Sequence, residues 1–264
     1  MILVEGNKGE RVEALQQALK NKGFDPGNVD GDFGPATEAA VIAFQKSEGL
    51  LPDGKAGPKT LSALGLDVLE EDKRGDATAQ FTVAVVSKMS PNSPIGNIKT
   101  HLPNILSALK ELDLDDRDMI LMAIGTIRAE TEGFEPISEF KSKFNTAPGG
   151  TPFGLYDNRK DLGNKGNPDG NSFKGRGFIQ LTGRANYTEI GSQIGVDLVN
   201  NPDKANDSVI ASKILARFLK NKERQIREAL LDNDLKTARK AVNGGTHGIE
   251  RFVAVFNTGN SLIA

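Results

Sequence analysis

The thirteen residues G-R-G-F-I-Q-L-T-G-R-A-N-Y, at positions 175–187, decide the fold of the larger part of this chain. They close a segment, residues 145–183, that holds nine glycines in 39 residues. Glycine lets a backbone approach a ligand closely, and this density is typical of a loop-built binding surface. We therefore expect this glycine-rich segment to form a surface that a ligand approaches.

Helical patterns lie on both sides of this stretch. Apolar residues at helical spacing predict five helices, over residues 81–89, 103–112, 116–131, 208–221 and 223–242. No run reaches the roughly 18–20 apolar residues of a membrane helix, so no membrane insertion is expected. We therefore predict an all-α domain over residues 79–264, preceded by a charged linker at residues 67–78.

Glu130 is a candidate general acid on the third of these helices. It shares one helical face with Ala123 and Ile127, so it extends an apolar stripe near the helix C-terminus. Apolar surroundings and the negative end of the helix dipole both favour a protonated carboxyl, the form that donates a proton to a leaving group. Helix geometry alone favours a plainer alternative, a boundary glutamate paired with a nearby arginine.

The first 66 residues contain an internal repeat. The pattern D-G-x-x-G-P-x-T occurs at residues 30–37 and again at residues 53–60. Glycine tolerates the positive φ of a tight turn, and proline fits the first position of a helix. Two such turns joining three amphipathic helices predict a small three-helix bundle over residues 1–66.

Composition excludes several kinds of site. The chain has no Cys and only two His, His101 and His247, so a thiol nucleophile is impossible and a zinc site would lack its usual ligands. The net charge of −2 gives no footprint for nucleic acid. We expect no metal, no cofactor and no nucleic-acid partner. Carboxylates remain as the groups for hydrolysis, and carboxylate pairs cleave glycosidic bonds.

Three motifs of the larger domain resemble those of family 19 glycoside hydrolases, the chitinase-like part of the lysozyme superfamily. A-E-T-E-G-F at residues 129–134 is similar to that family's H-E-T-G-G-F, with Ala129 in place of the histidine. Residues 175–187 match the family signature except that Phe178 replaces a proline, and V-N-G-G at residues 242–245 resembles the family's I-N-G-G. The resemblance implies a helical, lysozyme-like fold with two lobes and a cleft, and assigns the general acid to Glu130.

The same resemblance implies a second carboxylate that acts as the base. In compact bacterial members it lies nine residues after the acid, which is Glu139 here. Family 19 enzymes invert the anomeric configuration, so the two carboxyl groups should stand ~6.5–9.5 Å apart with a water between them. Glu132 and Glu135 are the rival candidates; Glu132 points to a different helix face from Glu130.

The resemblance also implies residues that bind substrate or support the acid. Thr182 would hold the attacking water, and Gln180, Asn186 and Asn243 would bind the N-acetyl sugar, unless these amides brace the loops instead. Tyr156 and Phe153 could stack on sugar faces or anchor the packing. Arg176 is expected to pair with a carboxylate for structural reasons, and Glu250 and Arg251 are expected behind the acid.

Residues 5–66 resemble the peptidoglycan-binding domain of cell-wall hydrolases, on their order of helix, turn and repeat motifs. Together, the two resemblances imply a peptidoglycan hydrolase of the N-acetylmuramidase type, organised as in modular phage endolysins. Its partner would be bacterial peptidoglycan, and we expect a monomer. A chitinase and a non-enzymatic wall-binding protein are the alternatives.

We also expect cytoplasmic synthesis. The first ten residues carry charge by Glu5 and no apolar run typical of a signal peptide. Release through a phage holin would then bring the protein to the wall.

Overall fold

The chain divides into two compact units. The computed structural model describes residues 2–66, 75–231, 234–245 and 248–263. One unit comprises residues 1–73 and 227–234, and the other comprises residues 74–226 and 235–264. Within the described residues, no helix is both long enough and apolar enough to cross a membrane.

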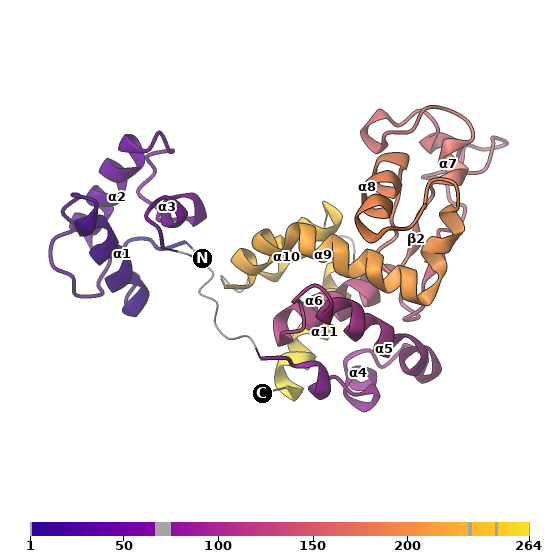
Figure 1. The fold of residues 1–264 in the computed structure, drawn as a ribbon, viewed down its shortest axis with the longest axis horizontal. Helices are drawn as coiled ribbons and strands as arrows, with labels where there is room; N and C mark the ends of the chain where they lie inside the picture. Colours follow the sequence, from indigo (N-terminus) through magenta and orange to yellow (C-terminus); the bar gives the residue numbers. More distant parts are fainter. Residues whose placement is uncertain (1, 67–74, 232–233, 246–247, 264) are drawn as a thin grey trace. The chain divides into compact units, whose positions relative to one another are not determined.

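The N-terminal unit contains the predicted three-helix bundle. Its helices are α1 (Glu10–Asn21), α2 (Pro35–Ser47) and α3 (Pro58–Ala63). Figure 1 shows the three helices grouped around one another. They enclose a core of their own, made by Leu3, Val12, Leu15, Leu19, Phe33, Ala40, Val41, Phe44, Ala56, Leu61 and Leu64. Proline opens both α2 and α3, as the repeat predicts.

A buried glutamine organises the first copy of the repeat. Gln16, on α1, donates from Nε2 to Asp30 Oδ1 at 3.0 Å, to the Asp32 carbonyl at 3.0 Å and to Thr37 Oγ1 at 3.1 Å. Its Oε1 accepts from the backbone N–H groups of Asp30 and Gly31. The side chain is 1% exposed, so it satisfies a turn that would otherwise bury unpaired polar groups.

Gln45, on α2, does the same for the second copy. Its Nε2 donates to Asp53 Oδ1, to the Lys55 carbonyl and to Thr60 Oγ1. Its Oε1 accepts from the Gly54 N–H at 3.0 Å. The polar residues of both repeats therefore build turns, as their composition alone suggests, and these contacts lie inside the bundle.

The larger unit is helical apart from one short strand pair. Its helices are α4 (Val83–Met89), α5 (Ile95–Lys110), α6 (Arg117–Thr131), α7 (Asp169–Ser172), α8 (Arg184–Ile194), most of α9 (Ser208–Leu231), α10 (Leu235–Asn243) and α11 (Ile249–Leu262). Residues 227–231 of α9 belong to the other unit. Strands β1 (Ile137–Ser138) and β2 (Arg176–Gly177) pair antiparallel, with Ile137 opposite Gly177. Single-turn 3-10 helices connect these elements: η1 (Thr78–Gln80), η2 (Gly154–Tyr156), η3 (Lys160–Leu162) and η4 (Pro202–Asn206). This architecture confirms the predicted all-α class.

Helix α6 packs mainly against α11, which also contacts α4, and α4 in turn contacts α5 (Figure 1). It is buried almost all round, not along one stripe. Two glycines allow α11 to approach it. A Cβ at Gly125 would lie 2.8 Å from the Phe252 ring, and one at Gly259 would lie 2.1 Å from Leu121 Cδ2. The packing fixes the helix that carries Glu130.

A second group gathers around α7, α8 and β2 (Figure 1). Its core consists of Phe173, Leu181, Tyr187, Ile190, Leu198, Ala205 and Ile214, so α9 contributes one of its members. The signature residues 175–187 run through this core and past β2. The two groups correspond to the two lobes that the resemblance implies.

Two predicted boundaries of helices are wrong. Pro103 was expected to open a helix, yet it lies inside α5, which begins at Ile95. Burial of Ile98, Leu102 and Ile105 on one face outweighs the backbone hydrogen bond that proline removes. The break expected near residue 222 is also absent, because α9 continues to Leu231.

The predicted linker is partly folded onto the larger unit. Residues 67–74 lie outside the described residues. Asp76 pairs with Lys110 at 2.6 Å, and the Ala77 N–H donates to the Asp115 carbonyl at 2.8 Å. The Lys110 ammonium and two bonds from Thr78 hold the pKa of the Asp76 carboxyl down at about 2. The larger unit thus includes residues 75–78, which were assigned to the linker.

Candidate active site

Glu130 lies in the last turn of α6, where the helix leaves the core. Residues 119–129 before it on the helix are buried, whereas the Glu130 side chain is 14% exposed. Arg239, on α10, donates from Nη2 to Glu130 Oε1 at 2.5 Å and is itself fully buried. Glu130 is therefore a boundary glutamate paired with an arginine, as helix geometry alone favoured, and its surrounding is not purely apolar.

The sequence did not identify Arg239 as the ion-pair partner of Glu130. Glu250 and Arg251 were predicted to stand behind the acid. Instead Arg251 Nη1 pairs with Glu132, and Glu250 is exposed. The ion pair between Arg239 and Glu130 joins elements 109 residues apart, so no local pattern announces it. The pair occupies Oε1 and leaves Oε2 as the oxygen that could exchange a proton with a ligand.

Glu139 follows β1 and is held by three hydrogen-bond donors. Its Oε1 accepts from Asn145 Nδ2 and from the Tyr156 hydroxyl, both at 2.8 Å. Its Oε2 accepts from the Gly175 N–H at 3.1 Å, and the Glu139 N–H donates to the Gly175 carbonyl at 2.8 Å. Donors that point at a carboxylate stabilise its charged form, which a general base requires.

Tyr156 supports the carboxylate of Glu139 with its hydroxyl. Burial and the hydrogen bond to Glu139 raise the pKa of Tyr156 to about 12. The phenol therefore keeps its proton, and remains a donor, throughout the neutral range. Phe153, the other aromatic candidate for stacking, is 4% exposed and packs beneath the Lys174 ammonium instead.

Gly175 needs to be glycine because of its neighbours, not because of its backbone angles. A Cβ there would lie 2.9 Å from Gln180 Oε1 and 3.3 Å from Glu139 Oε2. The first glycine of the signature thus lets the candidate base and a candidate sugar-binding amide share one small space. The structure brings Glu139, Tyr156 and Gln180 together around it.

The carboxylates of the two rival candidates, Glu132 and Glu135, have fewer hydrogen-bond donors around them than that of Glu139. Glu132 has left-handed backbone angles, φ 51, and pairs with Arg251. Glu135 is exposed, with one long contact from Asn97 Nδ2 at 3.4 Å. Neither is surrounded by convergent donors, so the geometry favours Glu139.

The side chains of Gln180, Thr182 and Asn186 form hydrogen bonds within the loop of residues 175–187. Gln180 Nε2 donates to the carbonyls of Ile137 and Gly177, at 3.0 and 3.1 Å. Thr182 Oγ1 donates to the Gln180 carbonyl at 2.8 Å, and Asn186 Nδ2 donates to the Thr182 carbonyl at 2.7 Å. The donors of both amides are thus engaged within the chain, while their carbonyl oxygens and the Thr182 lone pairs can accept from a ligand. Their roles toward substrate remain predictions.

Arg176 lies in the core of this lobe. It is 3% exposed and donates to the Ser172 carbonyl, to the Tyr187 hydroxyl and to Asp203. This arrangement agrees with the structural pairing expected of it.

Two segments of the chain match known protein families. Residues 8–64 match the peptidoglycan binding domain family, and residues 156–227 match the family described as chitinase class I. The chain is 46% identical over 67 residues to the zinc D-Ala-D-Ala carboxypeptidase of Streptomyces albus G, covering 24% of this chain and 25% of that protein. It is 54% identical over 55 residues to the acidic 27 kDa endochitinase of Solanum lycopersicum, covering 20% of this chain and 22% of that protein.

Solved structures agree on the fold. A bacterial family 19 chitinase superimposes with a TM-score of 0.51 at 18% identity, covering 70% of this chain and 95% of that one. Chitinase C from Streptomyces griseus HUT6037 superimposes with a TM-score of 0.50 at 18% identity, covering 70% of this chain and 76% of that one. Two separate segments of this chain therefore match a peptidoglycan-binding domain and a family 19 glycoside hydrolase domain, in this order. The segments matched in the two curated relatives amount to about a quarter of each relative or less.

Two predicted residues of the hydrolase domain remain undescribed in part or whole. Asn243 is the last residue of α10, and its side chain is not among those described; its role in sugar binding stays a prediction. His247 lies outside the described residues. His101 packs edge-on against Phe178 and contacts Ser208, and burial lowers its pKa, which fits an ordinary structural histidine.

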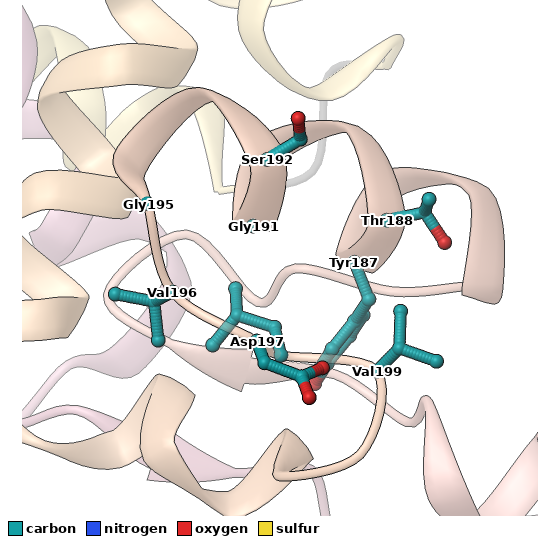
Figure 2. A pocket seen from close by; sticks show the side chains of 9 residues that line it. Tyr187, Thr188, Gly191, Ser192, Gly195, Val196, Asp197 and Val199 are labelled. Carbon is teal, nitrogen blue, oxygen red and sulfur yellow. The ribbon is translucent and has the colours of Figure 1, made fainter.

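The hydrolase domain also has a pocket away from these carboxylates. It measures about 270 Å³ and lies between α8 and the turn that follows it, with Tyr187 and Gly191 on one side and Val196 and Val199 on the other (Figure 2). Its one carboxylate, Asp197, accepts two hydrogen bonds from Asn200. A pocket with a single, internally satisfied carboxylate does not provide the acid and base that hydrolysis needs.

Proposed function

We propose that this protein hydrolyses the β-1,4 glycosidic bonds of bacterial peptidoglycan as an N-acetylmuramidase. The observation that carries the proposal is the carboxylate of Glu139, held by three donors in a family 19 domain whose helix α6 presents Glu130. The attached peptidoglycan-binding domain favours the bacterial wall as the polymer.

In this proposal Glu130 donates a proton to the leaving oxygen and Glu139 activates a water. Arg239 holds Oε1 of the Glu130 carboxyl in place, and this mechanism requires that Oε2 carries the proton when the leaving oxygen departs. Asn145, Tyr156 and Gly175 hold Glu139, which accepts a proton from water as the water attacks the anomeric carbon. Attack from the face opposite the leaving group inverts the configuration.

The test combines a variant with product analysis. Glu130→Gln keeps the shape of the side chain and removes the acid, and we expect release of reducing ends from sacculi to fall by roughly 10²-fold or more. Circular dichroism checks the fold, because the change also leaves the buried Arg239 charge without its carboxylate. Mass spectrometry of wild-type digests should show muramic acid at the new reducing end, and NMR during the first turnovers should show the α-anomer. Undiminished lysis by Glu130→Gln would contradict the mechanism.

A chitinase is the second candidate. It is favoured by the match of residues 156–227 to chitinase class I and by the similarity to the tomato endochitinase. Parallel digestion of chitin oligomers and purified peptidoglycan separates the two candidates, because only a muramidase cleaves after muramic acid.

Delivery to the wall after cytoplasmic synthesis, through a phage holin, belongs to the same proposal. Fractionation of expressing cells with and without a holin tests it: lytic activity should reach the wall only when the holin is present.

A further inference from the structure

An exposed apolar and basic segment directly follows the candidate base. Residues 140–144 read F-K-S-K-F, and both phenylalanine side chains are 77% exposed. Leu155, nearby in the fold, is 48% exposed. We name Phe140, Lys141, Lys143 and Phe144 the aromatic–basic ridge. Exposed apolar groups that cluster in this way mark a binding surface more often than they occur by chance.

One buried residue ties this ridge to Glu139. Asn145 is fully buried, and its Nδ2 donates both to Glu139 Oε1 at 2.8 Å and to the Phe140 carbonyl at 2.9 Å. Its Oδ1 accepts from the Ser142 N–H at 2.9 Å, and its carbonyl accepts from the Leu155 N–H at 3.2 Å. The ridge is therefore held at the edge of the catalytic carboxylate by the side chain that holds the carboxylate itself.

The ridge carries positive charge that the described residues do not neutralise. Lys141 and Lys143 are both exposed, and within the described part of the chain neither pairs with a carboxylate. The Lys143 ammonium lies 5.2 Å from the centre of the Phe144 ring. Residues 139–187 contain eight Lys and Arg against four Asp and Glu, although the chain as a whole has a net charge of −2. The stretch of sequence that begins with Glu139 is thus locally basic.

We propose that the aromatic–basic ridge binds the peptide-bearing part of the glycan strand, with its lysines on the carboxylates of the stem peptides. The proposal rests on the function proposed above and specifies what the site recognises. Aromatic faces suit the apolar faces of sugar rings, and exposed ammonium groups suit carboxylates. Peptidoglycan supplies both features, whereas chitin has no carboxylate. The ridge would therefore favour peptidoglycan over chitin at the catalytic site itself, independently of the wall-binding domain.

The test compares two lysine pairs on two forms of one substrate. Lys141→Gln/Lys143→Gln removes the ridge charges, and Lys88→Gln/Lys99→Gln removes equal charge from exposed positions on α4 and α5. Both variants and wild type, all full length, act on intact sacculi and on sacculi whose carboxylates have been converted to neutral amides. We expect KM of the ridge variant on intact sacculi to rise roughly three- to tenfold, with kcat unchanged. The effect should vanish on amidated sacculi and in high salt. The control pair should match wild type.

A second pair of substitutions tests the two phenylalanine side chains of the ridge. Phe140→Ala/Phe144→Ala should raise KM on both forms of the sacculi, because sugar rings are present in each. Both rings are exposed, so the unfolding midpoint should stay within a degree or two of wild type. In a Glu130→Gln background, binding to solubilised peptidoglycan strands reports the same contacts without turnover.

Failure of this inference differs from failure of the proposed function. If wild type releases reducing ends from sacculi but the lysine variant has the same KM and the same strand affinity, the inference is overturned and the function stands. If wild type releases none, the function fails, and the strand-binding comparison still decides the role of the ridge. Lysine-dependent binding to phosphatidylglycerol vesicles, with unchanged kinetics on sacculi, would assign the ridge to a membrane surface and also overturn the inference.

Discussion

Glu139 lies in a loop, yet its carboxylate is held by an amide, a phenol and a backbone N–H. Glu130 lies on a buried helix and is held by a single buried guanidinium. The two residues thus reach defined positions by different routes: one through convergent loop contacts, the other through packing of a helix. Arg239 is 109 residues from Glu130, whereas Asn145 is only six residues from Glu139 and holds it through the turn that follows β1. The glutamates are easier to predict than these partners because no periodic pattern marks either contact.

The Tyr156 hydroxyl gives a prediction at the scale of a single residue. Tyr156→Phe removes one donor from Glu139 and keeps the ring, so we expect kcat to fall about tenfold with little change in KM, because a hydrogen bond to a charged group contributes ~1.5–3 kcal/mol. Initial rates of release of reducing ends measure this. An unchanged kcat would mean that Asn145 and Gly175 suffice to position the base.

The raised pKa of Tyr156 predicts how the stability of wild type and of Tyr156→Phe depends on pH. The phenol ionises at about 12 in the folded protein against its ordinary 10.0, so the unfolded chain gives up this proton first. Stability linked to it is complete below pH 10 and is lost as the pH rises toward about 12. Denaturant unfolding should show wild type losing stability faster than Tyr156→Phe across that interval. Parallel curves for the two proteins would contradict the hydrogen bond to Glu139.

At the scale of elements, periodicity located helices better than it located their ends. The sequence pattern predicts α6 well, because Asp116 caps it by accepting from the Met119 N–H and the apolar spacing is strong. It misplaces the start of α5, because Pro103 is tolerated once tertiary burial stabilises the helix around it. It also does not foresee that α6 is buried all round, since that depends on close approach of α11 at Gly125 and Gly259. Sequence periodicity and capping residues therefore predict that a helix forms. Packing between helices decides where the helix begins and ends and which of its faces are buried.

The repeat of the N-terminal bundle gives a prediction at this scale. Gln16→Ala would leave the Asp30 and Gly31 N–H groups and the Thr37 hydroxyl without their buried partner, so we expect the bundle to lose ~2–4 kcal/mol of unfolding free energy. Gln17→Ala, at the adjacent and exposed position, is the matched control and should be near neutral. Denaturant unfolding, with the transition of the bundle followed separately, distinguishes them. Equal effects at both positions would show that the turn does not depend on this glutamine.

At the scale of the whole molecule, two separate cores support the proposed division between a wall-binding domain and a catalytic domain. The bundle packs around residues between Leu3 and Leu64, while the lobe that carries the signature packs around Phe173, Tyr187 and their neighbours. A wall-binding domain on the same chain raises the concentration of the catalytic domain at an insoluble polymer. It has no such effect on a short soluble substrate, which diffuses to the active site whether or not the protein is attached to a wall.

Removal of residues 1–66 tests this division of labour. We expect activity on intact sacculi to fall by roughly 10- to 100-fold, while kcat/KM on short soluble glycan fragments changes by less than about twofold, because tethering acts only on the insoluble substrate. Co-sedimentation with sacculi should fall in parallel with the activity on them, and circular dichroism should show that the catalytic domain keeps its helices. An equal loss on both substrates would instead give the bundle a role in folding of the catalytic domain, since a binding module acting at a distance cannot slow turnover of a free oligomer.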